Sequence, residues 1–427
     1  MYIVNARLAE RLCTGLQTRY EVGLTPTPPS KFYIMKKINE NTCPAFFLDA
    51  TIDPAGAYSP CTALGGGAFN FGTQSFKVTW LDPKLEDVRQ RSINNEKLKM
   101  CQRCWTEEEY GHTSERQYLK QDSGDIDYTD PLYYKSGPRH LNIKVSNICN
   151  LRCRTCQSRD SYLYHLEGEY YEKKNNIRNT PYTIEKFKKH FTDSQLDELY
   201  EFSGNLERIE LYGGEPFLDD QIPKYLLRLI ESGNSRNIDL SVSTNCTHKL
   251  DDKWRTILTN FKNVIINVSV DGIGKRFTYM RHPGDWATAE KNIKSFFDLA
   301  STHHNVNVVP VCTVSAINVW YIQEVFEYFG QYNVDPFLIL VQWPSYYCVN
   351  VFPDMVKSHI ETRLKEYTNN KFDAIIKLMY TEPKTLSTRA ASPWDEFKFW
   401  TKEKDEYRKE NFIETFPGIG EIIKSVW

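Results

Sequence analysis

The sequence lacks any apolar run near the roughly 20 residues that a membrane-spanning helix needs. It also lacks a basic start followed by an uninterrupted apolar stretch, which excludes a typical secretory signal. Neither charge dominates, because 53 Lys and Arg residues face 55 Asp and Glu residues, for a net charge of −2 and a pI near 6.5. Without a basic surplus, nucleic-acid binding is disfavoured. We therefore expect a soluble, cytoplasmic protein that does not enter a membrane.

Internal repeats and long low-complexity tracts are absent too, so the chain is not a solenoid or a disordered tail. Its 427 residues, 41% of them hydrophobic, suffice for two or three packed modules. We predict four segments: a Pro/Thr-rich leader or linker at 1–34 whose need for the fold is open, a cysteine-rich module at 35–137, a core at 138–345, and a helical region at 346–427.

Cysteine is present in a pattern that carries chemistry. Seven of the 11 cysteines fall in metal-ligand spacings, which indicates a reducing compartment rather than a disulfide framework. Cys149, Cys153 and Cys156 form CxxxCxxC, which offers an iron–sulfur cluster three thiolates from one loop. One iron of a 4Fe–4S cluster would then keep no protein ligand. A cluster that solvent reaches would also be sensitive to oxygen.

A second motif follows about sixty residues later. The strand-like run at 208–212 ends in Gly213, Gly214, Glu215 and Pro216. Glycine lets the backbone approach a ligand closely, and the exposed amides and carbonyls beside one carboxylate suit an amino-acid ammonium group.

The core predicts a parallel α/β fold, because β-branched runs alternate with helical stretches. The expected strands are 141–146, 208–212, 238–244, 264–270, 307–314 and 336–342. Six strands predict an open (βα)6 partial TIM-like barrel, with functional residues at the carboxyl ends of the strands.

Together the two motifs resemble the radical S-adenosylmethionine (SAM) superfamily. The resemblance implies that Cys149, Cys153 and Cys156 hold a 4Fe–4S cluster whose open iron binds SAM, with an external electron donor such as flavodoxin or ferredoxin. It also implies that SAM is cleaved to methionine and a 5′-deoxyadenosyl radical. Thr155 departs from the family, which usually has an aromatic residue there to contact adenine. Adenine packing must then come from elsewhere, for example from Tyr212 or from an apolar residue on the fifth strand.

By the same resemblance, Glu215 and the Gly213-Gly214 backbone hold the SAM ammonium, with Pro216 completing the motif. Further candidates for SAM contacts are Ser243, Asn245, Ser269 and Arg281. Arg281 is the candidate for the SAM carboxylate, because a guanidinium binds a carboxylate through two donors. Three of them have an ordinary alternative: a turn or capping role for Asn245 and Ser269, and a surface ion pair for Arg281.

Four more cysteines, Cys43, Cys61, Cys101 and Cys104, lie before the core. Four thiolates fit structural zinc and a 4Fe–4S cluster equally well. The pattern C-x17-C with a glycine at position 56, followed by CxxC, resembles the auxiliary-cluster part of SPASM and twitch domains. That resemblance implies one auxiliary cluster, twitch-like, since the further cysteines of a full SPASM domain are missing. The module also precedes the core, whereas twitch domains usually follow it.

The resulting hypothesis is a radical SAM enzyme that abstracts a hydrogen atom from its substrate. Relatives with SPASM or twitch modules often act on peptides, so a peptide or protein side chain is the leading substrate class, with a small carbohydrate or nucleoside as the alternative. A hypothesis of another class is a non-catalytic iron–sulfur or zinc scaffold or electron carrier.

Overall fold

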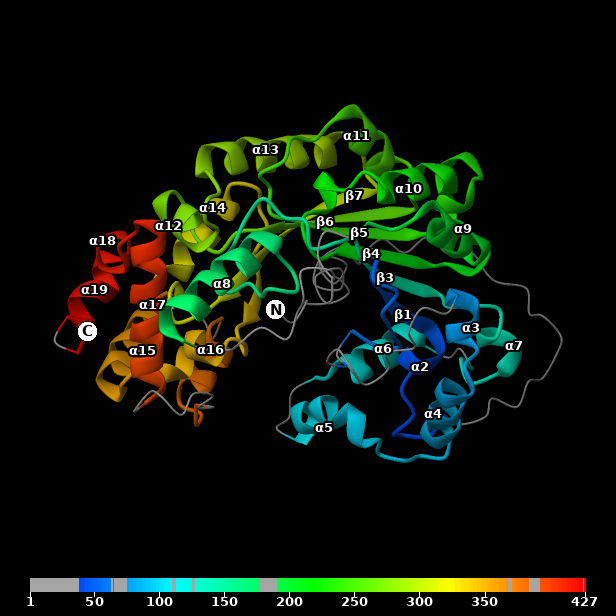
Figure 1. Cartoon of the computed structure of the whole chain (residues 1–427), viewed down its shortest axis with the longest axis horizontal. Helices are drawn as coiled ribbons and strands as arrows, with labels where there is room; N and C mark the ends of the chain where they lie inside the picture. The colour runs from blue at the N-terminus through cyan, green and yellow to red at the C-terminus, as the bar shows by residue number, and fades with distance from the viewer. Residues whose placement is uncertain are drawn as a thin grey trace, which may run out of the picture.

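The computed structural model describes residues 38–62, 64, 75–109, 113–124, 127–176, 190–367, 371–383, 392–424 and 426–427. The predicted leader at 1–34 lies outside these ranges. The described chain forms one sheet with helices along its outer face and a further helical layer at each end (Figure 1). No described helix is long and apolar enough to cross a membrane.

Eight strands form the sheet in the order β2-β1-β3-β4-β5-β6-β7-β8. Only β1 and β2 pair antiparallel, and every other neighbouring pair is parallel. The bounds are β1 (Asp49–Ile52), β2 (Tyr58–Ser59), β3 (His140–Lys144), β4 (Arg208–Tyr212), β5 (Asp239–Thr244), β6 (Asn263–Ser269), β7 (Val306–Val314) and β8 (Phe337–Leu340).

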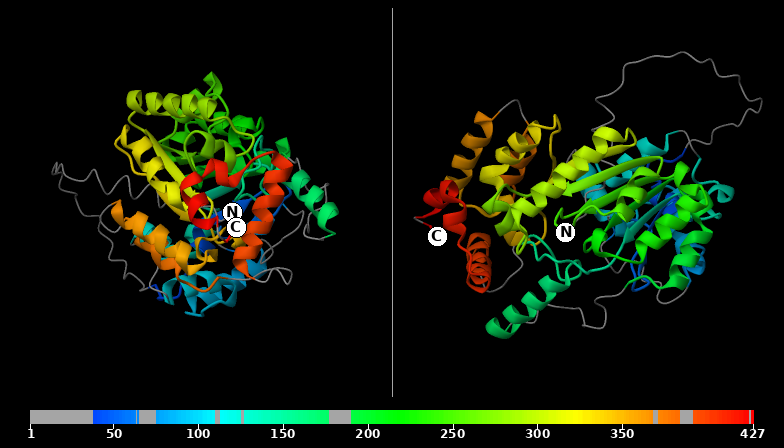
Figure 2. Two further views of the ribbon diagram at one scale, coloured as in Figure 1. Left: turned by 90° about the vertical axis from the view of Figure 1, so that its left-hand side faces the viewer. Right: turned by 90° about the horizontal axis from the view of Figure 1, so that it is seen from above.

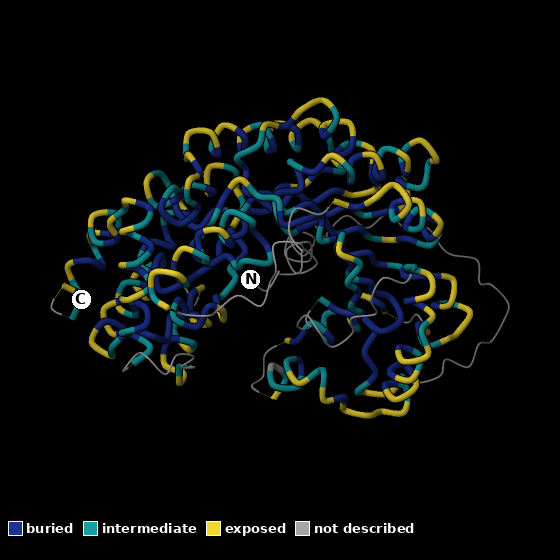
Figure 3. Tube along the Cα trace, in the orientation of Figure 1, coloured by how far each residue is buried: buried dark blue, intermediate teal, exposed yellow. Residues whose placement is uncertain are grey.

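Strands β3 to β8 confirm the six expected strands and the partial barrel. Their side chains alternate between two faces, as the period of a strand requires. Leu141, Ile143, Ile209 and Leu211 are fully buried in the main core beneath the helices. The dark interior of the tube in Figure 3 shows this buried layer between the exposed outer turns. The opposite face of the strands lines the inside of the barrel.

Helices cover the outer face of the sheet (Figure 1). Those of the barrel are α8 (Tyr162–Asn175), α9 (Asp193–Glu201), α10 (Ile222–Glu231), α11 (Asp252–Thr259), α12 (Lys275–Met280), α13 (Trp286–Thr302) and α14 (Ile322–Gly330). Helix α10 buries Ile222, Tyr225, Leu226 and Leu229, the spacing that places an apolar stripe on one side of a helix.

The region before the core adds two strands to the sheet. Strands β1 and β2 extend it beyond β3, with Asp49 opposite His140, a pairing the sequence did not reveal. The helices of this region are α2 (Ala45–Leu48), α3 (Phe76–Trp80), α4 (Pro83–Ile93), α5 (Gln102–Glu109), α6 (Glu115–Ser123) and α7 (Pro131–Tyr134). Buried Arg89 fixes α4 by donating to the carbonyls of Phe46 and Trp80, at 2.9 and 3.1 Å.

The region after the core is helical, as expected. It comprises α15 (Asp354–Glu366), α16 (Asp373–Met379), α17 (Pro393–Arg408), α18 (Phe412–Thr415) and α19 (Pro417–Ile423). Figure 2 shows these helices at the opposite end of the molecule from the blue module that precedes the core. The long helix α17 runs near α8, and side chains of both helices reach the loop that follows β3.

Candidate functional site

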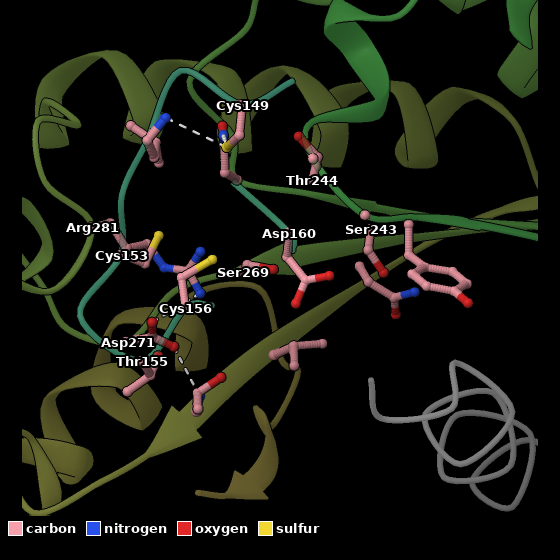
Figure 4. A pocket seen from close by; sticks show the side chains of 18 of the residues that line it. Cys149, Cys153, Thr155, Cys156, Asp160, Ser243, Thr244, Ser269, Asp271 and Arg281 are labelled. Atoms are coloured by element: carbon pink, nitrogen blue, oxygen red, sulfur yellow. Dashed lines mark hydrogen bonds and ion pairs between the residues drawn. The ribbon is translucent and has the colours of Figure 1, made fainter. Parts of the chain in front are cut away.

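Three cysteines of one loop face a single pocket at the carboxyl end of the sheet. Cys149, Cys153 and Cys156 follow β3 directly and all line this pocket (Figure 4). Two backbone hydrogen bonds of 2.8 Å fasten the loop to the end of α12: the amide of Arg152 donates to His282, and that of Arg154 to Met280. Backbone hydrogen bonds to the end of α12 therefore hold the loop in this conformation.

The pocket, together with the open solvent at its mouth, spans about 960 Å³. Besides the cysteines, its lining comes from the ends of five strands and the loops that follow them. These residues are Leu151, Thr155, Asp160, Tyr212, Gly213, Gly214, Ser243, Thr244, Asn245, Asn267, Ser269, Asp271, Arg281, Val311, Thr313 and Ile339. The expectation that polar strand ends gather at one mouth is confirmed by this lining.

The surroundings of the three thiols disfavour free thiolates, but a bound metal centre would stabilise them. Burial and neighbouring cysteines raise the pKa of Cys149 well above its usual range and that of Cys156 to about 12. The pKa of Cys153 is also raised by burial, against the opposing effect of Arg281. A bound cationic metal centre reverses this penalty, because thiolates are its ligands. The donor set therefore fits three ligands of a 4Fe–4S cluster.

Two N–H groups also point at a sulfur of this set. The amide of Leu151 donates to Cys149 Sγ at 3.4 Å, and Asn245 Nδ2 donates to the same atom at 3.6 Å. Hydrogen bonds to cluster sulfurs tune reduction potentials in iron–sulfur proteins. Asn245 thus has a contact with the cysteine set as well as a place in the pocket.

The Gly-Gly pair packs directly on the cysteine loop. The amide of Gly214 donates to the carbonyl of Ser146 at 2.8 Å, and that of Glu215 to the carbonyl of Ile148 at 2.9 Å. Gly213 has φ +112, and a Cβ on Gly214 would lie 2.1 Å from the oxygen of Ile148. The positive φ of Gly213 and the close approach of Gly214 to Ile148 both require glycine, which explains the two glycines of the motif.

Glu215 does not line the pocket. Its carboxylate accepts hydrogen bonds from Thr244 Oγ1 at 2.8 Å, the amide of Asn245 at 2.7 Å and the amide of Phe217 at 3.2 Å. Burial raises its pKa to about 7, although these donors oppose the shift. The carboxylate ties the ends of β4 and β5 together, and Pro216 is likewise outside the lining. A direct contact of Glu215 with SAM stays a prediction.

Arg281 reaches the pocket as part of a buried ion pair. Its Nη2 lies 2.9 Å from Asp271 Oδ2, while Asp271 Oδ1 accepts from the amide of Thr313 at 2.8 Å. Both side chains are almost fully buried, which differs from the surface pair considered as an alternative. The Nε of Arg281 is buried with no hydrogen-bond partner in the described structure, so it is available to an anionic ligand group.

Sequence reasoning missed several lining residues. Asp160 and Asn267 point into the pocket but belong to no motif. Ile339 gives the pocket an apolar side together with Val311, which lies on the fifth expected strand. The period-2 alternation of β6, β7 and β8 was the available signal, since it fixes which residues of a strand share a face. The residues that face the barrel interior follow from that alternation once the neighbouring strands are known.

The C-terminal helices hold the cysteine loop from behind. Arg154, between the second and third cysteines, is fully buried and pairs with Asp405 at 2.5 Å and Glu410 at 2.6 Å. Its guanidinium also stacks 3.5 Å from the Tyr279 ring centroid. Arg408 of α17 pairs with Glu167 of α8 at 3.0 Å. The region after the core therefore braces the outer side of the cysteine loop.

The four cysteines before the core lie at the other end of the sheet. Cys43 precedes β1, and Cys61 follows antiparallel β2, so both lie at the amino ends of the parallel strands. The length of β3 alone, about 16 Å, separates that edge from Cys149. Burial and then Cys61, Cys101 and Cys104 raise the pKa of Cys43 well above its usual range.

These thiols therefore lie within electrostatic range of one another. Two cations adjoin them: burial raises the pKa of Cys101 to about 12, which Arg116 opposes, and burial and then Arg116 lower the pKa of Lys120, which Cys43 opposes. Arg116 is itself fixed by Glu108 and lies 4.5 Å from the Trp105 ring centroid. Among the described residues, no three His, Cys, Asp or Glu side chains are gathered closely enough to hold one metal ion as they stand.

Comparisons with known proteins identify the barrel. The family model described as "Radical SAM superfamily" matches residues 143–318, which run from the end of β3 to the turn after β7. No curated protein matches this chain.

Solved structures with similar folds are distant in sequence. anSMEcpe with bound AdoMet is 18% identical over 55% of this chain and 61% of that chain, with a TM-score of 0.39, so the chain spans less than two thirds of it. Streptococcus suis SuiB bound to precursor peptide SuiA is 13% identical over 70% of this chain and 68% of that chain, with a TM-score of 0.37. The radical SAM methyltransferase TsrM from Kitasatospora setae, with cobalamin and a 4Fe–4S cluster bound, is 13% identical over 46% of this chain and 33% of that chain, with a TM-score of 0.31.

Proposed function

Because the barrel of this chain belongs to the radical SAM superfamily, we propose that the protein reductively cleaves SAM and abstracts a hydrogen atom from a peptide or protein side chain. The observation that carries the proposal is the meeting of Cys149, Cys153 and Cys156 with the Gly213-Gly214 backbone in one pocket. A small carbohydrate or nucleoside is the alternative substrate. The resemblance of the cysteine-rich region to the SPASM and twitch group supports the peptide class, and the twitch-containing relatives that act on small molecules support the alternative.

Cys149, Cys153 and Cys156 would hold the cluster, and one of its irons would have no ligand from these three cysteines. When bound, a 4Fe–4S cluster supplies the electron that cleaves SAM to methionine and a 5′-deoxyadenosyl radical. The chain's own part is to bind and orient SAM, since the cofactor carries the chemistry. The backbone of Gly213 and Gly214 is suited to the ammonium group, and Arg281 Nε to the carboxylate.

The remaining SAM contacts follow from the lining. Ser243 and Ser269 offer hydroxyls from the ends of β5 and β6, and Asn245 offers its amide beside Cys149. Ribose hydroxyls suit such groups, because each can donate and accept. Glu215 accepts hydrogen bonds from Thr244 and Asn245 and so fixes the end of β5 relative to the end of β4, which is a positioning role.

We also propose that Cys43, Cys61, Cys101 and Cys104 hold a second, auxiliary 4Fe–4S cluster, with zinc as the alternative. Three features support this proposal: the electrostatic proximity of the four thiols, their burial, and the adjoining cations Arg116 and Lys120. Cations offset the net negative charge that four thiolates give to either centre. The segment 35–137 would then act as an auxiliary-cluster module for the core at 138–345, with 346–427 as its helical support.

The decisive experiment measures 5′-deoxyadenosine by mass spectrometry. Anaerobically reconstituted protein is incubated with SAM and dithionite, and we expect product that disappears in Cys156→Ala. The non-catalytic alternative predicts a reduced cluster whose spectrum does not change when SAM is added. An electron paramagnetic resonance spectrum that stays unchanged on adding SAM, in protein that carries its cluster, would therefore contradict the proposal.

A further inference from the structure

The inside of the barrel has two chemically different walls. Polar residues of β3, β5 and β6 line one side, where Asn142, Ser241 and Asn267 are all buried. Apolar residues of β6, β7 and β8 line the other side and form a buried cluster separate from the main core: Ile265, Val309, Val311 and Phe337, with Ile339 packed against it. Val311 and Ile339 belong to the pocket itself.

The polar wall holds buried acceptors that have no hydrogen-bond partner in the described structure. Asn267 donates from Nδ2 to Ser241 Oγ at 2.9 Å, which leaves its Oδ1 without a partner. Deeper in the barrel, Asn142 donates weakly to Thr51 Oγ1 at 3.5 Å, and its Oδ1 is likewise without a partner. Buried polar atoms are rarely left so in proteins, and each costs free energy. A ligand that donates hydrogen bonds would satisfy them.

Asp160 adds a charge to this wall. Its carboxylate points into the middle of the pocket (Figure 4), and its side chain is only 9% exposed. Oδ1 pairs with Lys144 at 2.8 Å, while Oδ2 has no hydrogen-bond partner among the described residues and lies 3.6 Å from Arg159 Nε. Burial alone would raise the pKa of Asp160, but Lys144 and then Arg159 outweigh it and lower the pKa. The group is therefore an anion with one oxygen facing the pocket.

The charges that line the pocket favour a cationic guest. Besides the three cysteines, its charged lining residues are Asp160, Asp271 and Arg281, and the last two form an ion pair with each other. Asp160 is paired with Lys144 through Oδ1, so its Oδ2 is the carboxylate oxygen of this lining that still lacks a hydrogen-bond donor. Both the carboxylate and the two amide oxygens call for donors rather than acceptors on the ligand.

Resting on the proposed function, we propose that the substrate group entering the barrel is an aliphatic chain that ends in an ammonium group, with Asp160 as the specificity-determining residue. The ammonium donates to Asp160 Oδ2 and Asn267 Oδ1 on the polar wall. The aliphatic chain packs on Val311 and Ile339 on the opposite wall. A carboxylate of the same length is repelled, and a hydroxyl satisfies one acceptor without the charge.

Three probes with one common body test this assignment: n-hexylamine, hexan-1-ol and sodium hexanoate. Their affinities are measured by ligand-observed NMR with the anaerobically reconstituted protein and SAM, without a reductant. We expect hexylammonium to bind about tenfold or more tightly than hexanoate, because a hydrogen bond to a charged group contributes that much. Hexanol should fall between them. Equal binding of the three probes would overturn the inference.

Two variants locate the effect. Asp160→Asn, which is nearly isosteric, should remove the preference for hexylammonium, and Asn267→Leu should weaken it. Asp220→Asn, at an 85% exposed carboxylate, is the matched control and should keep it. A preference that survives Asp160→Asn would overturn the inference. So would a loss of SAM affinity in that variant with an unchanged preference, since Asp160 would then serve SAM.

The outcome is separable from that of the proposed function. Formation of 5′-deoxyadenosine is measured in the wild-type protein alone, and the substrate class is decided by the ratio of probe affinities. A protein that cleaves SAM but shows no preference refutes only the inference. A protein that prefers hexylammonium but never cleaves SAM refutes only the proposed reaction.

Discussion

The two cysteine sets are built in opposite ways at opposite ends of one sheet. Cys149, Cys153 and Cys156 come from one short loop at the carboxyl ends of the strands, and backbone hydrogen bonds to the end of α12 shape that loop. The four cysteines before the core come from three separate segments: before α2, after β2, and at the start of α5. There, side-chain cations adjoin the thiols.

The difference separates a site formed within one loop from a site formed by segments that are distant in the sequence. A loop that carries all its thiols can be placed by the strand before it and by backbone contacts. A site assembled from Cys43, Cys61, Cys101 and Cys104 exists only once β1 has paired with β3 and α5 has packed. The first set should therefore tolerate loss of the second.

The largest effect is expected from Cys104→Ala. Loss of one thiolate should remove the second metal centre, while iron bound to the loop of Cys149 stays, because the two sites share no residue. Iron and sulfide analysis of the anaerobically reconstituted variant should show about half of the wild-type content, if both sites hold 4Fe–4S clusters. Zinc analysis in parallel distinguishes the alternative metal.

Cys156→Ala serves as the reciprocal control, since it should lose the SAM-responsive cluster and retain the other. If either replacement emptied both sites in a folded protein, the division into independent sites would be wrong. Far-ultraviolet circular dichroism checks that each variant is folded.

The same contrast explains what could be predicted from sequence. The six barrel strands were predictable because β-branched runs between helical stretches are long enough to show their period. The pocket loop was predictable because CxxxCxxC places its ligands within eight residues. Strands β1 and β2 were not, since four and two residues carry no readable alternation and β1 depends on a partner more than eighty residues away.

Side-chain direction was the other limit. Glu215 was expected in the pocket from its motif, yet its carboxylate caps the amides of Phe217 and Asn245. Asp160 was not expected there at all, because its place depends on the ion pair with Lys144 of β3. Such choices are settled by competition among neighbouring donors and acceptors, which sequence spacing does not record.

Gly214→Ala tests the backbone bracing of the first site. The added Cβ would lie 2.1 Å from the Ile148 oxygen, next to Cys149, so the loop must shift. Crowding of this kind costs about 1–3 kcal/mol, and we expect a tenfold to hundredfold loss of SAM affinity by equilibrium binding. Gly330→Ala, with no atom within 4 Å of its added Cβ, is the control and should bind SAM as the wild type does. Equal affinities in the two variants would show that the loop is not braced through Gly214.

Glu215 gives the smallest effect and the sharpest test of how the pocket floor is held. Burial raises its pKa to about 7 from an ordinary value of 4.5, so the folded protein holds a proton over a range where the unfolded chain has lost it. Stability contributed by this group is therefore full below pH 4.5 and is lost as the pH rises toward 7 and above. Between pH 5 and 7 the loss should be about 2 kcal/mol in the free energy of unfolding. Urea unfolding of the metal-free protein measures it, with Glu215→Gln as the comparison, because an amide cannot titrate. A wild-type slope no steeper than that of Glu215→Gln would mean that Glu215 stays charged and that its three donors outweigh its burial.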